Sequence, residues 1–166
     1  MRFVLALLVP LAAALLQGSV VPLVTIADAR PNLPVLVAAS WSVAVGAREA
    51  VWWAFLGGIA ADLLSGGPLG ALALAALPAV AAVGIGDRSV RSVALLPAVA
   101  LVALAAIASA GAYVAILALS GQALPPVARL LADGVGGALY TAALALVIYP
   151  VARLLRDLTE PRGGAA

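Results

Sequence analysis

Long apolar stretches occupy almost the whole chain, and they constrain its fold more than any other feature of the sequence. Hydrophobic residues make up 66% of the chain and charged residues 10%, whereas soluble domains average roughly 45–50% and 25%. A helix that crosses the hydrocarbon core of a bilayer needs about 20 mainly apolar residues. We therefore predict an all-α integral membrane protein, with six transmembrane helices in one compact bundle over residues 1–158. The expected spans are about 3–26, 32–45, 49–65, 69–85, 93–119 and 127–155.

The sequence leaves alternatives open for the second stretch and for the N-terminus. The second stretch, 32–45, is short for a full crossing, so five crossings with this segment re-entrant is the alternative to six. At the N-terminus, Arg2 and the apolar run Phe3–Leu16 have the pattern of a secretory signal peptide. The run continues to Ile26, longer than a signal core of roughly 7–15 residues, which favours a retained helix. Residues 159–166 are expected to form a short cytoplasmic tail.

The arginines predict the orientation, because cytoplasmic loops of membrane proteins carry an excess of positive charge. All nine basic residues are arginine, and the net charge is +2. If the N-terminus is cytoplasmic, only Arg30 and Arg129 fall on the outer side. We predict a multi-pass protein with both termini in the cytoplasm, and removal of a signal peptide would leave the same final topology. The cytoplasmic set is Arg2, Arg48, Arg88, Arg91, Arg153, Arg156 and Arg162.

The sequence offers little for catalysis or for binding a metal. It has no cysteine and no histidine, which excludes disulfides, a thiol nucleophile, Cys or His metal ligands and a His acid–base catalyst. Arginines come in ones and twos, so the basic patch of a nucleic-acid-binding protein is absent. An intramembrane enzyme would need paired acids or a serine with a base at one depth, and the chain has one deep acid. We expect no enzyme, no cofactor and no nucleic-acid partner, and the lipid bilayer as surroundings.

Asp62 is the most informative charge in the sequence. It lies well inside the third stretch, where an ionised carboxylate costs at least about 2–3 kcal/mol and should face protein or water. Helical spacing places Phe55, Gly58, Asp62 and Ser65 on one stripe. This stripe is small and partly polar, so we expect it to face neighbouring helices.

Two interpretations of Asp62 compete. In the first, it is a proton or substrate site of a transporter, since intramembrane acids are functional candidates by default. In the second, it is a structural partner for Arg30 or Arg129, or for backbone amides of the Gly66-Gly67 turn. No second acid lies at similar depth and no His or Lys continues a relay. The structural interpretation is therefore favoured.

Other features have simpler interpretations. Arg129 and Asp133 are four residues apart, so they can pair on one helix face, and such exposed pairs contribute little to stability. Small residues recur at four-residue spacing, which lets membrane helices approach closely and permits a partner helix, including one from a homodimer. Aromatic residues near the expected membrane edges are interpreted as headgroup anchors. The small pairs are Gly57/Ala61, Gly66/Gly70, Gly134/Ala138 and Gly137/Thr141, and the anchors are Trp52, Trp53 and Tyr149.

The stretch from Pro31 to Gly70 carries a recognisable pattern. Pro31-Asn32 opens the second span and Arg48-Glu49 opens the third. This stretch resembles the rod shape-determining protein MreD, a bacterial inner-membrane family, and the match is good over about a quarter of the chain. The remaining motif residues are Phe55, Gly57, Gly58, Asp62, Gly66, Gly67, Pro68 and Gly70.

The resemblance implies a function without known catalysis. Members of this family act in the elongasome, the machinery that synthesises peptidoglycan in the lateral cell wall, and so regulate cell shape. They bind MreC, a single-span membrane protein, and through it connect to MreB, to RodA and to the transpeptidase that accompanies RodA. The family fold is similar to that of S components of energy-coupling-factor transporters, which is an analogy of fold. The alternative to a scaffold is therefore a small transporter or S-component-like subunit that uses Asp62.

Overall fold

The computed structural model describes residues 2–25, 29–85 and 93–159. Within these ranges the chain forms six α-helices, one short 3-10 helix and no strand. A helix lies in each of the six stretches that the sequence predicted as helical. Most of the predicted tail and three of the predicted cytoplasmic arginines, Arg88, Arg91 and Arg162, lie outside the described residues. The helices are α1 (Arg2–Ser19), η1 (Val21–Leu23), α2 (Leu33–Val45), α3 (Ala47–Ser65), α4 (Ala71–Gly84), α5 (Leu95–Leu119) and α6 (Val127–Thr159).

Local sequence signals explain several helix boundaries. Asn32 precedes α2, and its side-chain oxygen accepts a hydrogen bond from the backbone N–H of Val35 at 3.2 Å, which satisfies one of the free amides of the first turn. Gly66 ends α3 in the left-handed conformation, with φ of 69°, as is common at the C-terminal end of helices. The first stretch is helical only to Ser19, and η1 continues it.

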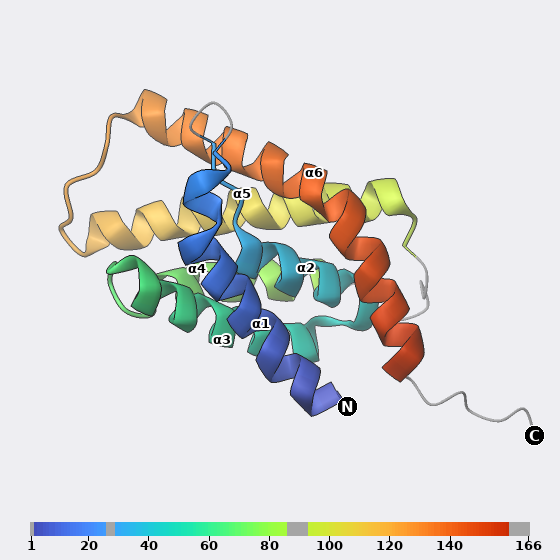
Figure 1. The fold of residues 1–166 in the computed structure, drawn as a ribbon. Helices are drawn as coiled ribbons and strands as arrows, with labels where there is room; N and C mark the ends of the chain where they lie inside the picture. Colours follow the sequence, from blue (N-terminus) through green and yellow to red (C-terminus); the bar gives the residue numbers. More distant parts are fainter. Residues whose placement is uncertain (1, 26–28, 86–92, 160–166) are drawn as a thin grey trace, which may run out of the picture.

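The short helix α2 is the centre of the bundle. It contacts all five other α-helices, and most of its residues are buried. Figure 1 shows the longer α1, α5 and α6 around it. The same view places the N-terminus and the C-terminal end of α6 at one end of the molecule, and the α3–α4 turn and the 120–126 connection at the opposite end. Both ends of the described chain therefore reach one side of the bundle.

The distribution of side chains is the reverse of that in a soluble protein. The buried core consists largely of alanines, and large apolar side chains point outward along every α-helix except the central α2. In water such a surface would promote aggregation, whereas hydrocarbon solvates it. The largest fully buried side chains are Trp41, Tyr149 and Leu36, and strongly exposed apolar ones include Phe3, Ile85, Leu96 and Leu119.

Within the described residues, three helical segments are long and apolar enough to cross a membrane. They are Phe3–Leu23, Leu95–Leu119 and Val127–Thr159. By contrast, α2 has 13 residues and α4 has 14, which at about 1.5 Å per residue reach roughly 20 Å, less than the roughly 30 Å hydrocarbon core. With 19 residues, α3 is intermediate in length, and it carries three charged side chains.

Candidate functional site

Asp62 joins α3 to α4. Its carboxylate accepts a hydrogen bond from the backbone N–H of Leu72 in the first turn of α4, at 3.1 Å to Oδ2 and 3.3 Å to Oδ1. Gly70 precedes α4 with φ of 87°, and it has no side chain to cap the helix. Asp62 is only 2% exposed, and it supplies the missing acceptor at a helix end where negative charge is favourable. The carboxylate therefore acts as an N-terminal cap that comes from the preceding helix.

The arginine partners predicted for Asp62 do not contact it. Neither Arg30 nor Arg129 forms an ion pair with Asp62, and Arg129 does not pair with Asp133; within the described ranges the ion pair present is Arg156 with Asp157 at 2.7 Å. The physical reason is proximity, since the free amides at the start of α4 lie directly beside the carboxylate. The prediction of a backbone partner is therefore correct in kind. The amide that binds Asp62 belongs to Leu72, however, and not to the Gly66-Gly67 turn.

Two glycines allow α3 to pack closely against its neighbours. A Cβ at Gly58 would lie 2.5 Å from the Cα of Ala73, so α3 and α4 are in backbone contact there. A Cβ at Gly57 would lie 3.3 Å from Cβ of Pro34 and 3.4 Å from Cβ of Pro10, where α1 and α2 cross α3. The predicted inward stripe on α3 is correct at Gly58 and Asp62. It is wrong at Phe55 and Ser65, whose side chains are exposed because no other helix covers them.

The turn Ser65–Gly70 is short and held by its own backbone. Ser65 Oγ donates to the carbonyl of Asp62 at 3.3 Å and accepts from the N–H of Gly67 at 3.4 Å. The N–H of Ala71 donates to the carbonyl of Pro68 at 3.1 Å. The motif residues of this region are thus used to build a tight hairpin of α3 and α4.

Pro31 and Asn32 belong to a second polar cluster, which joins α1, α2 and α6. The Gln17 side chain donates to the carbonyl of Pro31 at 3.0 Å and accepts from the N–H of Leu33 at 2.7 Å. The N–H of Asn32 donates to Thr141 Oγ1 at 3.1 Å, and Thr141 donates to the carbonyl of Gly137 at 2.7 Å. No role in this cluster was predicted for Gln17 or Thr141; the available signal was that each is a polar residue inside an apolar helix.

Arg48 and Glu49 begin α3 at the opposite end of the bundle. The indole N–H of Trp41 donates to Glu49 Oε2 at 3.3 Å. Trp41 also stacks on Trp53, with ring centroids 4.5 Å apart. Arg48 is exposed. This end of α3 therefore anchors the largest side chain of the core.

The predicted headgroup anchors are only partly right. Trp52 is 63% exposed and can lie at a membrane surface, but Trp53 is 3% exposed and belongs to the core. Tyr149 is also buried, at 1% exposed, and its hydroxyl donates to the carbonyl of Val93 at 2.8 Å. The anchor role is wrong for these two residues because neighbouring helices enclose them.

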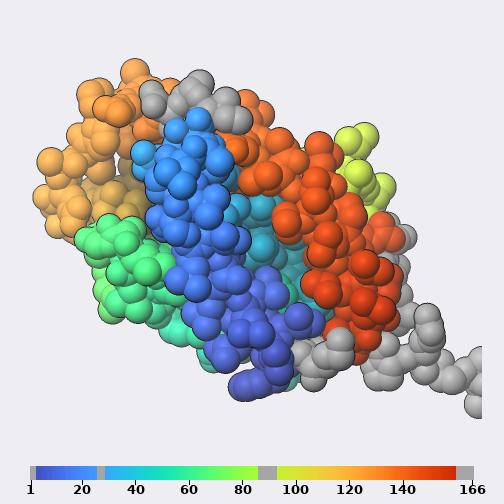
Figure 2. Space-filling model, in the orientation of Figure 1, coloured from blue at the N-terminus to red at the C-terminus, as the bar shows by residue number. Residues whose placement is uncertain are grey.

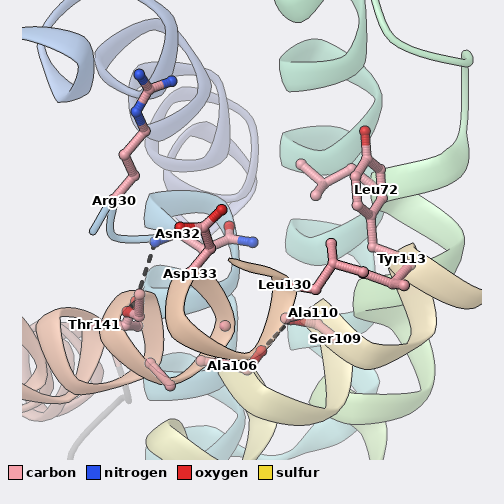
Figure 3. A pocket seen from close by; sticks show the side chains of 14 residues that line it. Arg30, Asn32, Leu72, Ala106, Ser109, Ala110, Tyr113, Leu130, Asp133 and Thr141 are labelled. Atoms are coloured by element: carbon pink, nitrogen blue, oxygen red, sulfur yellow. Dashed lines mark hydrogen bonds between the residues drawn. The ribbon is translucent and has the colours of Figure 1, made fainter. Parts of the chain in front are cut away.

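A cavity of about 210 Å³ lies at the end of the bundle that holds the α3–α4 turn. Figure 3 shows Asn32 and Asp133 on one side of it and Tyr113 and Leu72 on the other. Asp62 is not one of the lining residues. The full lining is Arg30, Asn32, Leu72, Ala106, Ser109, Ala110, Tyr113, Val114, Leu130, Asp133, Gly134, Gly137, Ala138 and Thr141.

Comparison with known proteins gives one positive result. The family model of the rod shape-determining protein MreD matches residues 1–157, so the match extends far beyond the Pro31–Gly70 stretch that first suggested it. No curated protein and no solved structure matches the chain. Together with the membrane-length apolar helices, the family match shows that this chain belongs to the rod shape-determining protein MreD family of bacterial membrane proteins.

Proposed function

We propose that this protein is a non-catalytic scaffold of the bacterial lateral cell-wall synthesis complex, which binds MreC in the inner membrane. Through MreC it would connect to MreB, RodA and the RodA transpeptidase. The observation that carries the proposal is the family match over residues 1–157. Members of that family determine rod shape, and a scaffold requires stable helix packing and an accessible membrane-facing surface.

The arrangement of the helices supports a six-span bundle with both termini in the cytoplasm. The short α2 and α4 pack among longer helices, as their contacts indicate. A short helix inside a bundle can be accommodated by local thinning of the bilayer or by protein neighbours. The ends of α1 and α6 lie on one side of the molecule (Figure 1), as an even number of crossings requires.

The environment of Asp62 supports a scaffold over a transporter. The carboxylate is almost fully buried, and the Leu72 amide binds both of its oxygens. A carboxylate that caps a helix in this way is satisfied by the fold itself. Its presence inside the membrane is thereby explained without a substrate or a transported proton.

Association with MreC is the experiment that tests the proposal. The full chain and MreC from the same organism are co-expressed, one of them is affinity-tagged, and the complex is isolated both in detergent and in lipid nanodiscs. We expect the two proteins to co-elute, and we expect depletion of this protein to convert rod-shaped cells to round ones. Failure to associate in both environments would contradict the proposal.

The alternative is a membrane subunit that binds a small substrate, and the size and the lining of the cavity both argue against it. The cavity volume of about 210 Å³ is below the roughly 300–1,000 Å³ of sites for drug-sized ligands, so a vitamin-sized molecule would not fit inside it. This candidate also assigned the substrate to Asp62, which does not line the cavity. If Asp62→Asn leaves transport of every tested solute at background and retains MreC binding, this candidate fails.

A further inference from the structure

The lining of the cavity combines small apolar residues with two charged residues, Arg30 and Asp133. Small residues of α5 and α6 line much of it, among them Ala106, Ala110 and Gly134. The lining residues of α5 and α6 belong to the parts of these helices that diverge toward the 120–126 connection in Figure 1. Figure 2 shows a hollow on this face beside that connection. The cavity therefore lies at the end of the bundle predicted to be extracytoplasmic.

Two of the polar groups in the lining are satisfied by the fold. The Ser109 hydroxyl donates to the carbonyl of Ala106 at 3.0 Å. The Thr141 hydroxyl donates to the carbonyl of Gly137 and accepts from the N–H of Asn32, an interaction drawn in Figure 3. These groups give the cavity its shape, and they need no ligand.

The two charged side chains of the lining are exposed and form no ion pair within the described residues. Arg30 and Asp133 make no ion pair with each other or with another described residue. Across the cavity from Asp133, the Tyr113 hydroxyl makes no hydrogen bond to the part of the chain that the structure describes. One cation and one anion thus line one small space while remaining apart. A ligand with a single charge would be attracted by one of the two and repelled by the other.

We propose that this cavity binds the headgroup of a zwitterionic aminophospholipid from the outer leaflet, with phosphatidylethanolamine as the simplest case. Arg30 would bind the phosphate, for which guanidinium geometry is well suited, and Asp133 would accept hydrogen bonds from the ammonium group. The inference depends on the predicted orientation of the bundle and goes beyond MreC binding, so either proposal can fail alone.

The size of the cavity is consistent with a headgroup. About 210 Å³ corresponds to about seven water-sized groups, at roughly 30 Å³ each. The acyl chains must therefore remain outside. Large exposed apolar side chains lie in the 120–126 connection and the first turns of α6, including Leu124, Val127 and Leu131, and they provide a surface for those chains.

Glycine substitutions provide the sharpest test, because two glycines in α5 and α6 are matched. Gly134 lines the cavity, and a Cβ added there would meet nothing within 4 Å. A Cβ at Gly111 also meets nothing within 4 Å, but Gly111 does not line the cavity. Both Gly134→Leu and Gly111→Leu should fold, which thermal unfolding of the purified full chain in detergent verifies.

The measurement is lipid retention by native mass spectrometry, with equal concentrations of phosphatidylethanolamine and phosphatidylglycerol. We expect the wild type and Gly111→Leu to retain phosphatidylethanolamine preferentially, and Gly134→Leu to retain about tenfold less, because the leucine side chain would occupy part of the cavity. Equal retention by both variants would overturn the proposal.

Charge variants identify the two contacts, and a soluble competitor identifies the source of the headgroup. Asp133→Asn should remove the preference for phosphatidylethanolamine, and Arg30→Gln should lower retention of both lipids. The control Arg129→Gln, an exposed arginine outside the lining, should behave as the wild type. Free phosphoethanolamine that binds as tightly as the lipid would contradict a lipid ligand, as would an effect of Arg129→Gln equal to that of Arg30→Gln.

Discussion

Glycines have opposite roles in two regions of this molecule. At the junction of α1, α2, α3 and α4, Gly57 and Gly58 are needed because other helices approach within contact distance of a Cβ. In the diverging parts of α5 and α6, Gly111 and Gly134 have open space where a side chain would be. Glycine therefore allows close helix packing in the first region and leaves open space in the second. The spacing of the glycines in the sequence does not distinguish these two roles.

The largest loss of stability is expected from an aromatic substitution on α3, in the closely packed region. Trp53→Ala removes a buried ring stacked on Trp41, so we expect a loss of about 3–5 kcal/mol in the free energy of unfolding. Trp52→Ala changes an exposed neighbour in the same helix and should have little effect. Thermal or denaturant unfolding in detergent measures both, and equal losses would mean that the core is placed incorrectly.

A smaller effect is expected from adding one methyl group to a glycine. Gly58→Ala places a Cβ against the Cα of Ala73, a backbone atom that cannot rotate away. We expect a loss of about 1–3 kcal/mol from overpacking. Gly111→Ala is the matched control in open space. If the two variants have the same melting temperature, the close contact of α3 and α4 is contradicted.

Removal of the Asp62 cap should destabilise the hairpin to a similar or smaller extent. Asp62→Ala leaves the Leu72 amide without its acceptor, which should cost about 1–3 kcal/mol. Asp62→Asn keeps an oxygen acceptor and should lose less. Hydrogen exchange at the first turn of α4 measures the local effect, and unchanged protection in Asp62→Ala would exclude the capping role.

The smallest expected effect is a gain in the free energy of unfolding. Gly134→Ala meets no neighbour and replaces a residue that disfavours helices, so we expect a gain of up to about 1 kcal/mol. A rise in the melting temperature of the purified protein would confirm that this part of α6 is open. A fall comparable to that of Gly58→Ala would remove the distinction between the two regions.

The sequence was sufficient for the fold class and the helices. The length and apolar character of the stretches predicted a helix in each of the six segments. The central position of α2 could not be predicted, because its short length fitted a re-entrant segment as well as a buried helix. The burial of Trp53 and Tyr149 was missed for a related reason: a position near a membrane edge does not show which side of the helix other helices cover.

The site was predicted only in part. Asp62 was identified from its depth in an apolar helix, and the favoured structural role agrees with its contact to Leu72. Its partner was missed because any backbone amide can serve as a donor, so no residue type marks it. The contact of Asn32 with Thr141 joins residues 109 positions apart, and it depends on the packing of α6 against α2, which no local pattern encodes.

The central claim is that Asp62 serves this family member as a structural cap and has no role as an ionisable functional group. Rod-shape rescue tests it most directly, in cells of the source organism depleted of this protein and supplied with Asp62→Asn or Asp62→Ala at matched membrane levels. We predict that Asp62→Asn restores rods, because it keeps an acceptor for Leu72, and that Asp62→Ala restores them less. Round cells with a correctly folded Asp62→Asn protein would contradict the claim.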